Sequence, residues 1–159
     1  MIINLIGRTK DAVKLQAKHA VEDVINFLGQ PTLLELTIKF VSAKEIERLN
    51  KVMRGIDKPT DVLSFPNLNI KAGEQIDASA LKTNPLYSFD GKNIYLGDCA
   101  ICLKIAKYQA QEFNKTLESE VRKLVVHSVL HLLGYDHIKD SDYLLMHDIE
   151  NKILGETDE

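Results

Sequence analysis

Three of the chain's five histidines, His127, His131 and His137, fall within the eleven residues HSVLHLLGYDH. If histidines were placed at random, a window of this length would hold about a third of one. His127 and His131 are four residues apart, so a helix places their imidazoles on one face, about one turn apart. Gly134 can adopt the left-handed conformation that ends a helix and turns the chain back. The spacing therefore predicts that all three imidazoles converge on one point.

Converging imidazoles predict a metal site. Three histidine ligands without a fourth protein ligand are typical of catalytic zinc, whereas structural zinc sites usually have four protein ligands. Zinc lowers the pKa of a water in the open position to about 7 and polarises a substrate oxygen. We therefore expect one Zn2+ ion at His127, His131 and His137, although nickel or cobalt would also suit imidazoles. Two core histidines and a surface one are the alternative, which leaves the spacing and the glycine unexplained.

A metalloprotease-like zinc hydrolase is the second enzymatic hypothesis. The metzincin proteases share the spacing H-x-x-x-H-x-x-G-x-x-H and place a glutamate base directly after the first histidine. Ser128 occupies that position here, and a serine hydroxyl does not take a proton at neutral pH. Met146 follows the motif, but its place on an apolar helical face predicts a core residue. Peptide hydrolysis by the metzincin mechanism is therefore disfavoured.

Composition predicts one globular domain spanning residues 1–159, with 45% hydrophobic and 27% charged residues. No stretch reaches the roughly 18 uninterrupted apolar residues that a membrane helix needs, and the first residues are unlike a signal peptide. We therefore expect a cytoplasmic protein with no membrane association. Cys99 and Cys102 form one C-x-x-C within an apolar run. We expect them to be small buried hydrophobes and not a redox or zinc-binding pair.

Hydrophobic periodicity predicts an α+β fold, in which a small mixed sheet packs with about five helices. The strands are expected at residues 2–6, 34–40, 62–65 and 94–96. The helices are expected at residues 10–28, 43–53, 100–113, 117–133 and 141–154. Ser42 and Glu45 form a capping box before the second helix. Residues 67–93 have no sustained period and predict a long loop with a local turn.

The segment around the first two histidines, LVVHSVLHLL, is apolar nearly all round. A helix of this kind is usually buried. We therefore expect the metal site to lie on a buried C-terminal helix.

Charge is distributed unevenly along the chain. The formal net charge is −3, which argues against a generally basic nucleic-acid binder. Residues 136–159 carry eight acidic residues and two lysines, a balance of −6, so the preceding residues carry +3. Residues 39–58 hold six basic residues against three acidic ones. This run is either a solvated helix face or a modest phosphate-binding patch.

Three blocks of the chain resemble the YbeY family. They are HSVLHLLGYDH, LNKVMRGIDKPTDVLSFP at residues 49–66 and LGDCAIC at residues 96–102. The usual family form has glycine where this chain has Ser128. Because serine is small, we expect the metal geometry to persist. The segment between Pro66 and Leu96 looks longer than in a typical member, so no function is transferred to it.

The resemblance implies a zinc-dependent endoribonuclease that cuts single-stranded RNA. It also implies a role in 3′-end maturation of 16S rRNA and in ribosome quality control, with small-subunit rRNA and ribosomal proteins as partners. Arg54 corresponds to the basic residue that lines the family's cleft. A guanidinium there would contact the negative charge that develops on an attacked phosphodiester. A surface ion pair is the alternative for Arg54, and a non-catalytic, zinc-stabilised ribosome assembly factor is the alternative for the chain.

For other polar residues, the sequence gives weaker evidence of a functional role. Asp136 would either orient a histidine, pair with a lysine or cap a turn. Asp61, Ser64 and Asp98 lie near strand ends, where polar residues cap turns more often than they react. His19 and His147 have polar or charged neighbours and no metal-ligand spacing to the cluster, so we expect them to be exposed and give them no role. The sequence hypothesis therefore has four site residues, the three clustered histidines and Arg54.

Overall fold

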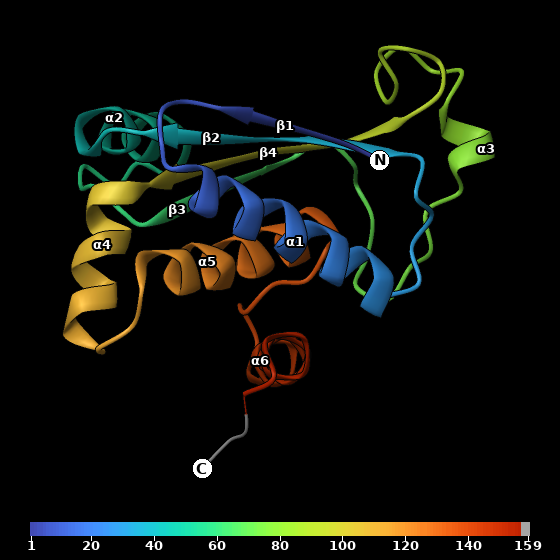
Figure 1. The fold of residues 1–159 in the computed structure, drawn as a ribbon. Coiled ribbons are helices and arrows are strands. Elements are labelled where there is room, and N and C mark those ends of the chain that lie inside the picture. Colours follow the sequence, from blue (N-terminus) through green and yellow to red (C-terminus); the bar gives the residue numbers. More distant parts are fainter. Residues whose placement is uncertain (157–159) are drawn as a thin grey trace.

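The computed structural model describes residues 1–156, and within this range four strands form one mixed sheet in the order β1-β2-β4-β3 (Figure 1). Their bounds are Ile2–Ile6 for β1, Leu34–Val41 for β2, Val62–Pro66 for β3 and Ile94–Cys102 for β4. β1 and β4 both pair with β2 in parallel, whereas β3 pairs with β4 antiparallel. The predicted mixed sheet is therefore confirmed.

Six helices accompany this sheet within residues 1–156. They are α1 (Asp11–Phe27), α2 (Ala43–Arg54), α3 (Ala78–Leu81), α4 (Leu103–Glu112), α5 (Leu117–Leu132) and α6 (Asp140–Leu154). α1 and α5 pack side by side under one face of the sheet, and α6 is seen nearly end-on below α5 (Figure 1). The expected α+β class is confirmed. The additional helix is α3, which has only four residues.

α5 is the central helix of the core. It contacts β3 and β4 above it, α1 and α4 beside it and α6 below it. From Leu124 onward the helix is apolar on nearly every side, and residues such as Leu124, Val125 and Val129 are buried. Thr116 caps its first turn, because the threonine hydroxyl accepts a hydrogen bond from the Ser119 amide at 3.1 Å. The predicted burial of this helix is confirmed.

The region after Leu96 differs from our expectation. We predicted a helix from Ala100, but β4 continues to Cys102 and α4 begins only at the next residue. Cys99 belongs to the core on the α1 and α5 side of the sheet, whereas Ala100 and Cys102 pack with Ile46 of α2 on the other side. A strand that is buried on both faces is a continuous apolar run, which periodicity does not separate from a buried helix. Both cysteines are free and buried, as expected.

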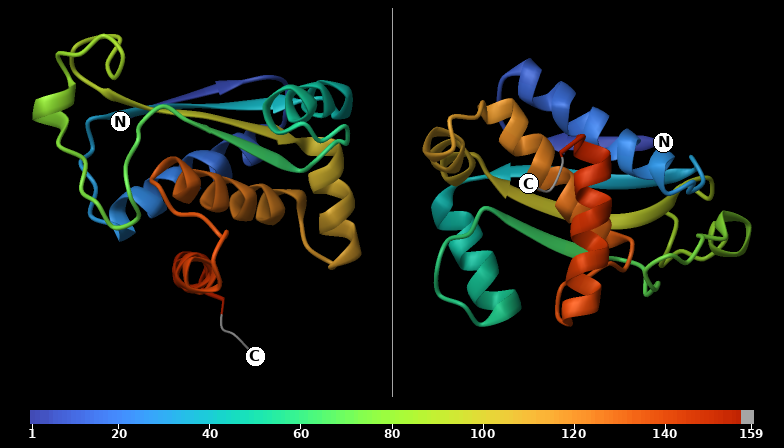
Figure 2. Two further views of the ribbon diagram at one scale, coloured as in Figure 1. Left: turned by 180° about the vertical axis from the view of Figure 1, so that it is seen from behind. Right: turned by 90° about the horizontal axis from the view of Figure 1, so that it is seen from below.

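Residues 67–93 form the predicted long connection, at the end of the sheet away from α4 (Figure 2). Leu68 and Ile76 are buried in the main core. The Gln30 side chain donates to the Glu74 carbonyl at 2.9 Å and accepts from the Ile76 amide at 3.0 Å. The connection is therefore anchored near the end of α1. None of the helices within residues 1–156 combines the length and the apolar character that a membrane span requires.

Candidate metal centre

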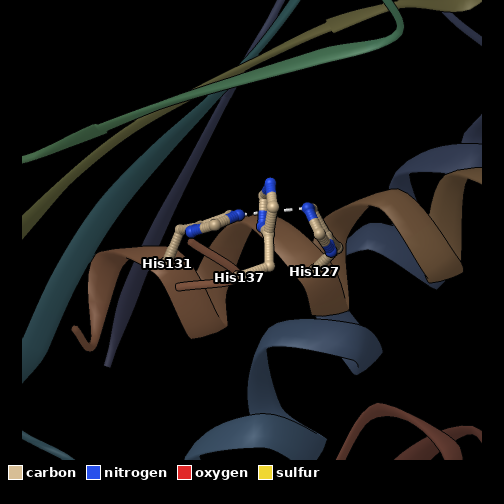
Figure 3. A group of neighbouring side chains, drawn as sticks. All are labelled: His127, His131 and His137. Carbon is tan, nitrogen blue, oxygen red and sulfur yellow. Dashed lines mark hydrogen bonds between the residues drawn. The ribbon is translucent and has the colours of Figure 1, made fainter. Parts of the chain in front are cut away.

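The three predicted histidines converge in space (Figure 3). His127 and His131 project from α5, and His137 approaches from the segment that follows. Their candidate ligand atoms all lie within 4.8 Å of one another, and the Nε2 atoms of His127 and His131 are 3.1 Å apart. Nitrogens that bind one zinc ion tetrahedrally at 2.0–2.1 Å are roughly 3.3 Å apart. The His127–His131 pair is close to this spacing, and the cluster as a whole could hold one shared metal ion.

Gly134 brings His137 into the cluster. α5 ends at Leu132, and the backbone amide of Tyr135 donates to the Leu130 carbonyl at 3.0 Å, which folds the chain back across the helix end. Gly134 has φ +93°, a conformation that side chains disfavour. A Cβ at this position would also collide with the backbone carbonyl of Ile70. The predicted left-handed glycine is therefore confirmed, and the structure adds a steric reason for it.

Glu150 of α6 contacts the Nδ1 atom of His127. Its Oε1 atom lies 2.6 Å from His127 Nδ1, and its side chain is only 16% exposed. A carboxylate at Nδ1 leaves Nε2 as the free ligand atom and increases its basicity. Sequence reasoning missed this residue because it lies 23 positions from His127 on another helix. Asp136, considered for this role, instead accepts from the Ile138 amide at 3.3 Å and caps a turn.

The electrostatics of the cluster favour a metal over a proton. Burial of His131, together with the neighbouring charges of His127 and His137, lowers the pKa of the His131 imidazole to about 4. His131 is therefore neutral near pH 7, the form that binds metals. Three imidazole nitrogens suit Zn2+ and similar divalent ions, and one of the imidazoles, that of His127, contacts the Glu150 carboxylate. The residues present could thus hold a metal ion.

A cleft of about 510 Å³ opens in front of the cluster, and all three histidines line it. Arg54, the last residue of α2, also lines it. α2 begins at the predicted Ser42 cap, whose hydroxyl accepts from the Glu45 amide, and ends at Gly55 with φ +70°. The Arg54 side chain is exposed, and no carboxylate within residues 1–156 forms an ion pair with it. The surface ion pair considered from the sequence is therefore not seen in the described part of the chain.

Ser128 faces the sheet. Its side chain is fully buried, and its hydroxyl lies 2.6 Å from the hydroxyl of Ser64 on β3. It also hydrogen-bonds the Cys99 thiol, whose pKa is raised to about 12, chiefly by burial. The serine that replaces the usual glycine therefore connects α5 to two strands.

The remaining polar candidates are held in local networks. The Asp61 carboxylate accepts from the Val62 amide at 2.8 Å, as expected for a residue at a strand end. Asp98 accepts from the Tyr95 hydroxyl at 2.8 Å. His19 is exposed, as predicted. The prediction for His147 is wrong, because this side chain is half-buried and its ring stacks on Tyr143 with a centroid distance of 5.6 Å.

An α+β fold with an open three-histidine cluster in a cleft is the arrangement expected of a metal-dependent hydrolase. Comparison with known families gives a more specific assignment. The sequence model of the family Endoribonuclease YbeY matches residues 4–158. The chain therefore belongs to the YbeY family, as its three sequence blocks predicted.

Individual relatives agree with this assignment. The Endoribonuclease YbeY of Clostridium botulinum (strain Kyoto / Type A2) is 40% identical over 156 residues, covering 92% of each chain. The Endoribonuclease YbeY of Clostridium beijerinckii is 42% identical over 123 residues, covering 76% of this chain and 73% of that protein. The solution structure of TM1509 from Thermotoga maritima is similar with a TM-score of 0.60 and 28% identity. That similarity covers 96% of this chain and 87% of TM1509.

Proposed function

We propose that residues 1–159 form a single zinc-dependent domain that cleaves single-stranded RNA endonucleolytically. The observation that carries the proposal is that the three clustered histidines and Arg54 line the same cleft, in a chain that belongs to an endoribonuclease family. His127, His131 and His137 would hold one zinc ion, which supplies Lewis acidity and activates the attacking oxygen. The remaining chemistry falls to side chains of the cleft.

Arg54 is the proposed catalytic residue for the phosphodiester. Negative charge develops on the nonbridging oxygens during attack, and a planar guanidinium can donate to two of them. Its neighbours on α2 already have carboxylate partners. Arg48 lies 2.7 Å from Glu45, and Lys51 lies 3.6 Å from Asp57. Arg54 has no such partner within residues 1–156, so a phosphate does not have to displace a carboxylate from it.

The cellular role that we propose follows the family resemblance. The chain would act in the cytoplasm on small-subunit rRNA, in 3′-end maturation of 16S rRNA and in ribosome quality control. Ribosomal proteins would be partners in that setting. RNA in loops and at strand ends exposes bases and phosphates that a duplex keeps in its grooves, and such regions are the usual targets of RNA-binding clefts. An open cleft such as the one lined by Arg54 and the three histidines therefore suits a single-stranded substrate.

The direct test compares cleavage of labelled single-stranded and double-stranded RNA by zinc-loaded protein. We expect cleavage of the single strand, and we expect Arg54→Ala to lower kcat about 10²- to 10³-fold, with Arg54→Lys intermediate. Arg48→Ala is the matched control, because Arg48 is also exposed on α2 but does not line the cleft. Undiminished cleavage by Arg54→Ala would remove the catalytic role of this residue.

Metal removal separates the enzyme from the two alternatives. If zinc only stabilises an assembly factor, wild-type protein should show no RNA turnover, and chelation should mainly alter the circular dichroism. We expect chelation to abolish RNA cleavage under conditions in which the circular dichroism persists, and zinc to restore it. A metalloprotease-like hydrolase would cleave a denatured protein substrate, which we expect to remain intact.

A further inference from the structure

A second pocket, of about 250 Å³, opens on the α6 side of the histidine cluster. The residues that line it are His127, His137, Tyr143, Met146, His147 and Glu150. Two of these, His127 and His137, also line the larger cleft that contains Arg54. The second pocket therefore adjoins the cleft at these two histidines. A chain-like substrate that crosses the cluster would reach both.

The walls of the second pocket suit a flat, aromatic group. Tyr143 and His147 lie one turn apart on α6, and their rings are nearly parallel, with an interplanar angle of 12°. Met146 lies between them in sequence and is only 2% exposed, so it forms a fixed apolar wall. Tyr143 is 50% exposed, which leaves part of its surface open to a ligand. Such aromatic surfaces are common binding places for single-stranded bases.

A positive side chain, Arg54, distinguishes the larger cleft from the second pocket. The α6 side carries Glu150 in the pocket wall and Asp140 and Asp142 in the first helical turn. Carboxylates repel a phosphate, so the backbone of a nucleic acid is disfavoured on this side. Arg54 lines the larger cleft but not the second pocket, and its positive charge attracts the phosphate backbone there. Asp61 and Asp136 also line that cleft, but each carboxylate already accepts a hydrogen bond from a nearby backbone amide. A nucleotide would therefore place its phosphate toward Arg54 and its base toward α6.

We propose that the second pocket binds one nucleobase of the RNA strand, stacked on Tyr143, while the adjoining phosphodiester lies at the histidine cluster. This inference rests on the proposed function and adds a specificity determinant to it. A base within a duplex is paired and stacked on its neighbours, so it is not available to enter the pocket. The pocket thereby supplies a structural cause for single-strand preference. Because every base has a π face, the stack tolerates any base.

The test combines a variant with an altered substrate. Zinc-loaded wild-type protein and Tyr143→Ala are compared on a short single-stranded RNA and on versions with one abasic ribonucleotide at successive positions. With intact RNA, we expect Tyr143→Ala to lower kcat/KM by about tenfold. For the wild-type protein, an abasic ribonucleotide at one particular position should lower kcat/KM by a similar factor. For Tyr143→Ala, the same abasic substrate should be cleaved with nearly the same kcat/KM as intact RNA. Such non-additivity reports a direct contact, since a structural defect would reduce cleavage of all substrates equally.

Two control variants complete the test. Tyr143→Phe keeps the ring and should restore most of the kcat/KM that Tyr143→Ala loses. Leu144→Ala removes an exposed residue of the same helix that does not line the pocket, and it should also behave as wild type. Equal abasic penalties in wild type and Tyr143→Ala would overturn the base pocket while leaving RNA cleavage standing. Absence of cleavage by the wild-type protein would refute the proposed function, and the base pocket with it.

Discussion

His127 Nδ1 lies 2.6 Å from Glu150 Oε1, so α6 directly contacts the histidine cluster. α6 crosses below α5 in the ribbon views (Figures 1 and 2). This packing brings the Glu150 carboxylate to Nδ1 of His127. A metal-binding histidine commonly has such a partner, which selects the tautomer and orients the ring. α6 therefore belongs to the candidate metal centre although it supplies none of the three predicted ligands.

Replacement of Glu150 should weaken metal binding without unfolding the protein. We expect Glu150→Gln to raise the zinc dissociation constant by about tenfold to a hundredfold, because the neutral amide is a weaker acceptor for the His127 N–H. Competition with a chromophoric chelator measures this constant directly. Asp148→Asn is the control on the same helix, since Asp148 is exposed and pairs with Lys152 at 2.9 Å. Equal zinc affinities for the two variants would contradict the role of Glu150.

Gly134 should tolerate no side chain. We expect Gly134→Ala to lower the free energy of unfolding by about 2–5 kcal/mol, because alanine resists φ +93° and its Cβ would collide with the Ile70 carbonyl. The displaced turn should also weaken zinc binding through His137. Gly29→Ala is the matched control, since Gly29 has φ +62° but open space around it, and it should cost only about 1–2 kcal/mol. Urea denaturation of both variants measures the difference.

Ser128 should contribute to stability and not to metal binding. Ser128→Ala removes the hydroxyl that contacts Ser64 and Cys99, and we expect it to lower the free energy of unfolding by about 1 kcal/mol. Ser128→Gly, which restores the usual family residue, should cost about 1 kcal/mol more because glycine disfavours a helix. Zinc affinity should stay at the wild-type value in both variants. A marked loss of affinity would show that this hydroxyl also supports the cluster.

The metal-free protein should lose stability in mild acid. Burial and two neighbouring histidines lower the folded-state pKa of His131 from 6.5 to about 4, so the unfolded chain binds a proton more readily than the folded one between these values. The stabilising contribution is therefore complete above pH 6.5 and is lost as the pH falls toward 4. Urea denaturation across this range should show a falling free energy of unfolding. His131→Asn should reduce the slope, whereas His19→Asn, at an exposed site, should retain it.

Most element positions could be predicted from local pattern alone. The strand Ile2–Ile6, the Ser42 cap and the end of α5 before Gly134 all agree with the structure. β4 is the exception. Over Cys99–Cys102, alternate residues pack into different clusters on the two faces of the sheet, which makes each of these four positions apolar and removes the period. The boundary between strand and helix at Cys102 is therefore set by packing and was not visible in the sequence.

The sequence by itself determined the three-histidine cluster, because helical spacing and one glycine bring His127, His131 and His137 together within eleven residues. The tertiary structure decided what surrounds it. Arg54 reaches the cleft from α2, Glu150 reaches the cluster from α6, and Tyr143 forms a neighbouring pocket. Contacts between distant segments depend on how apolar helix and sheet faces pack, and residue spacing carries no information about that packing.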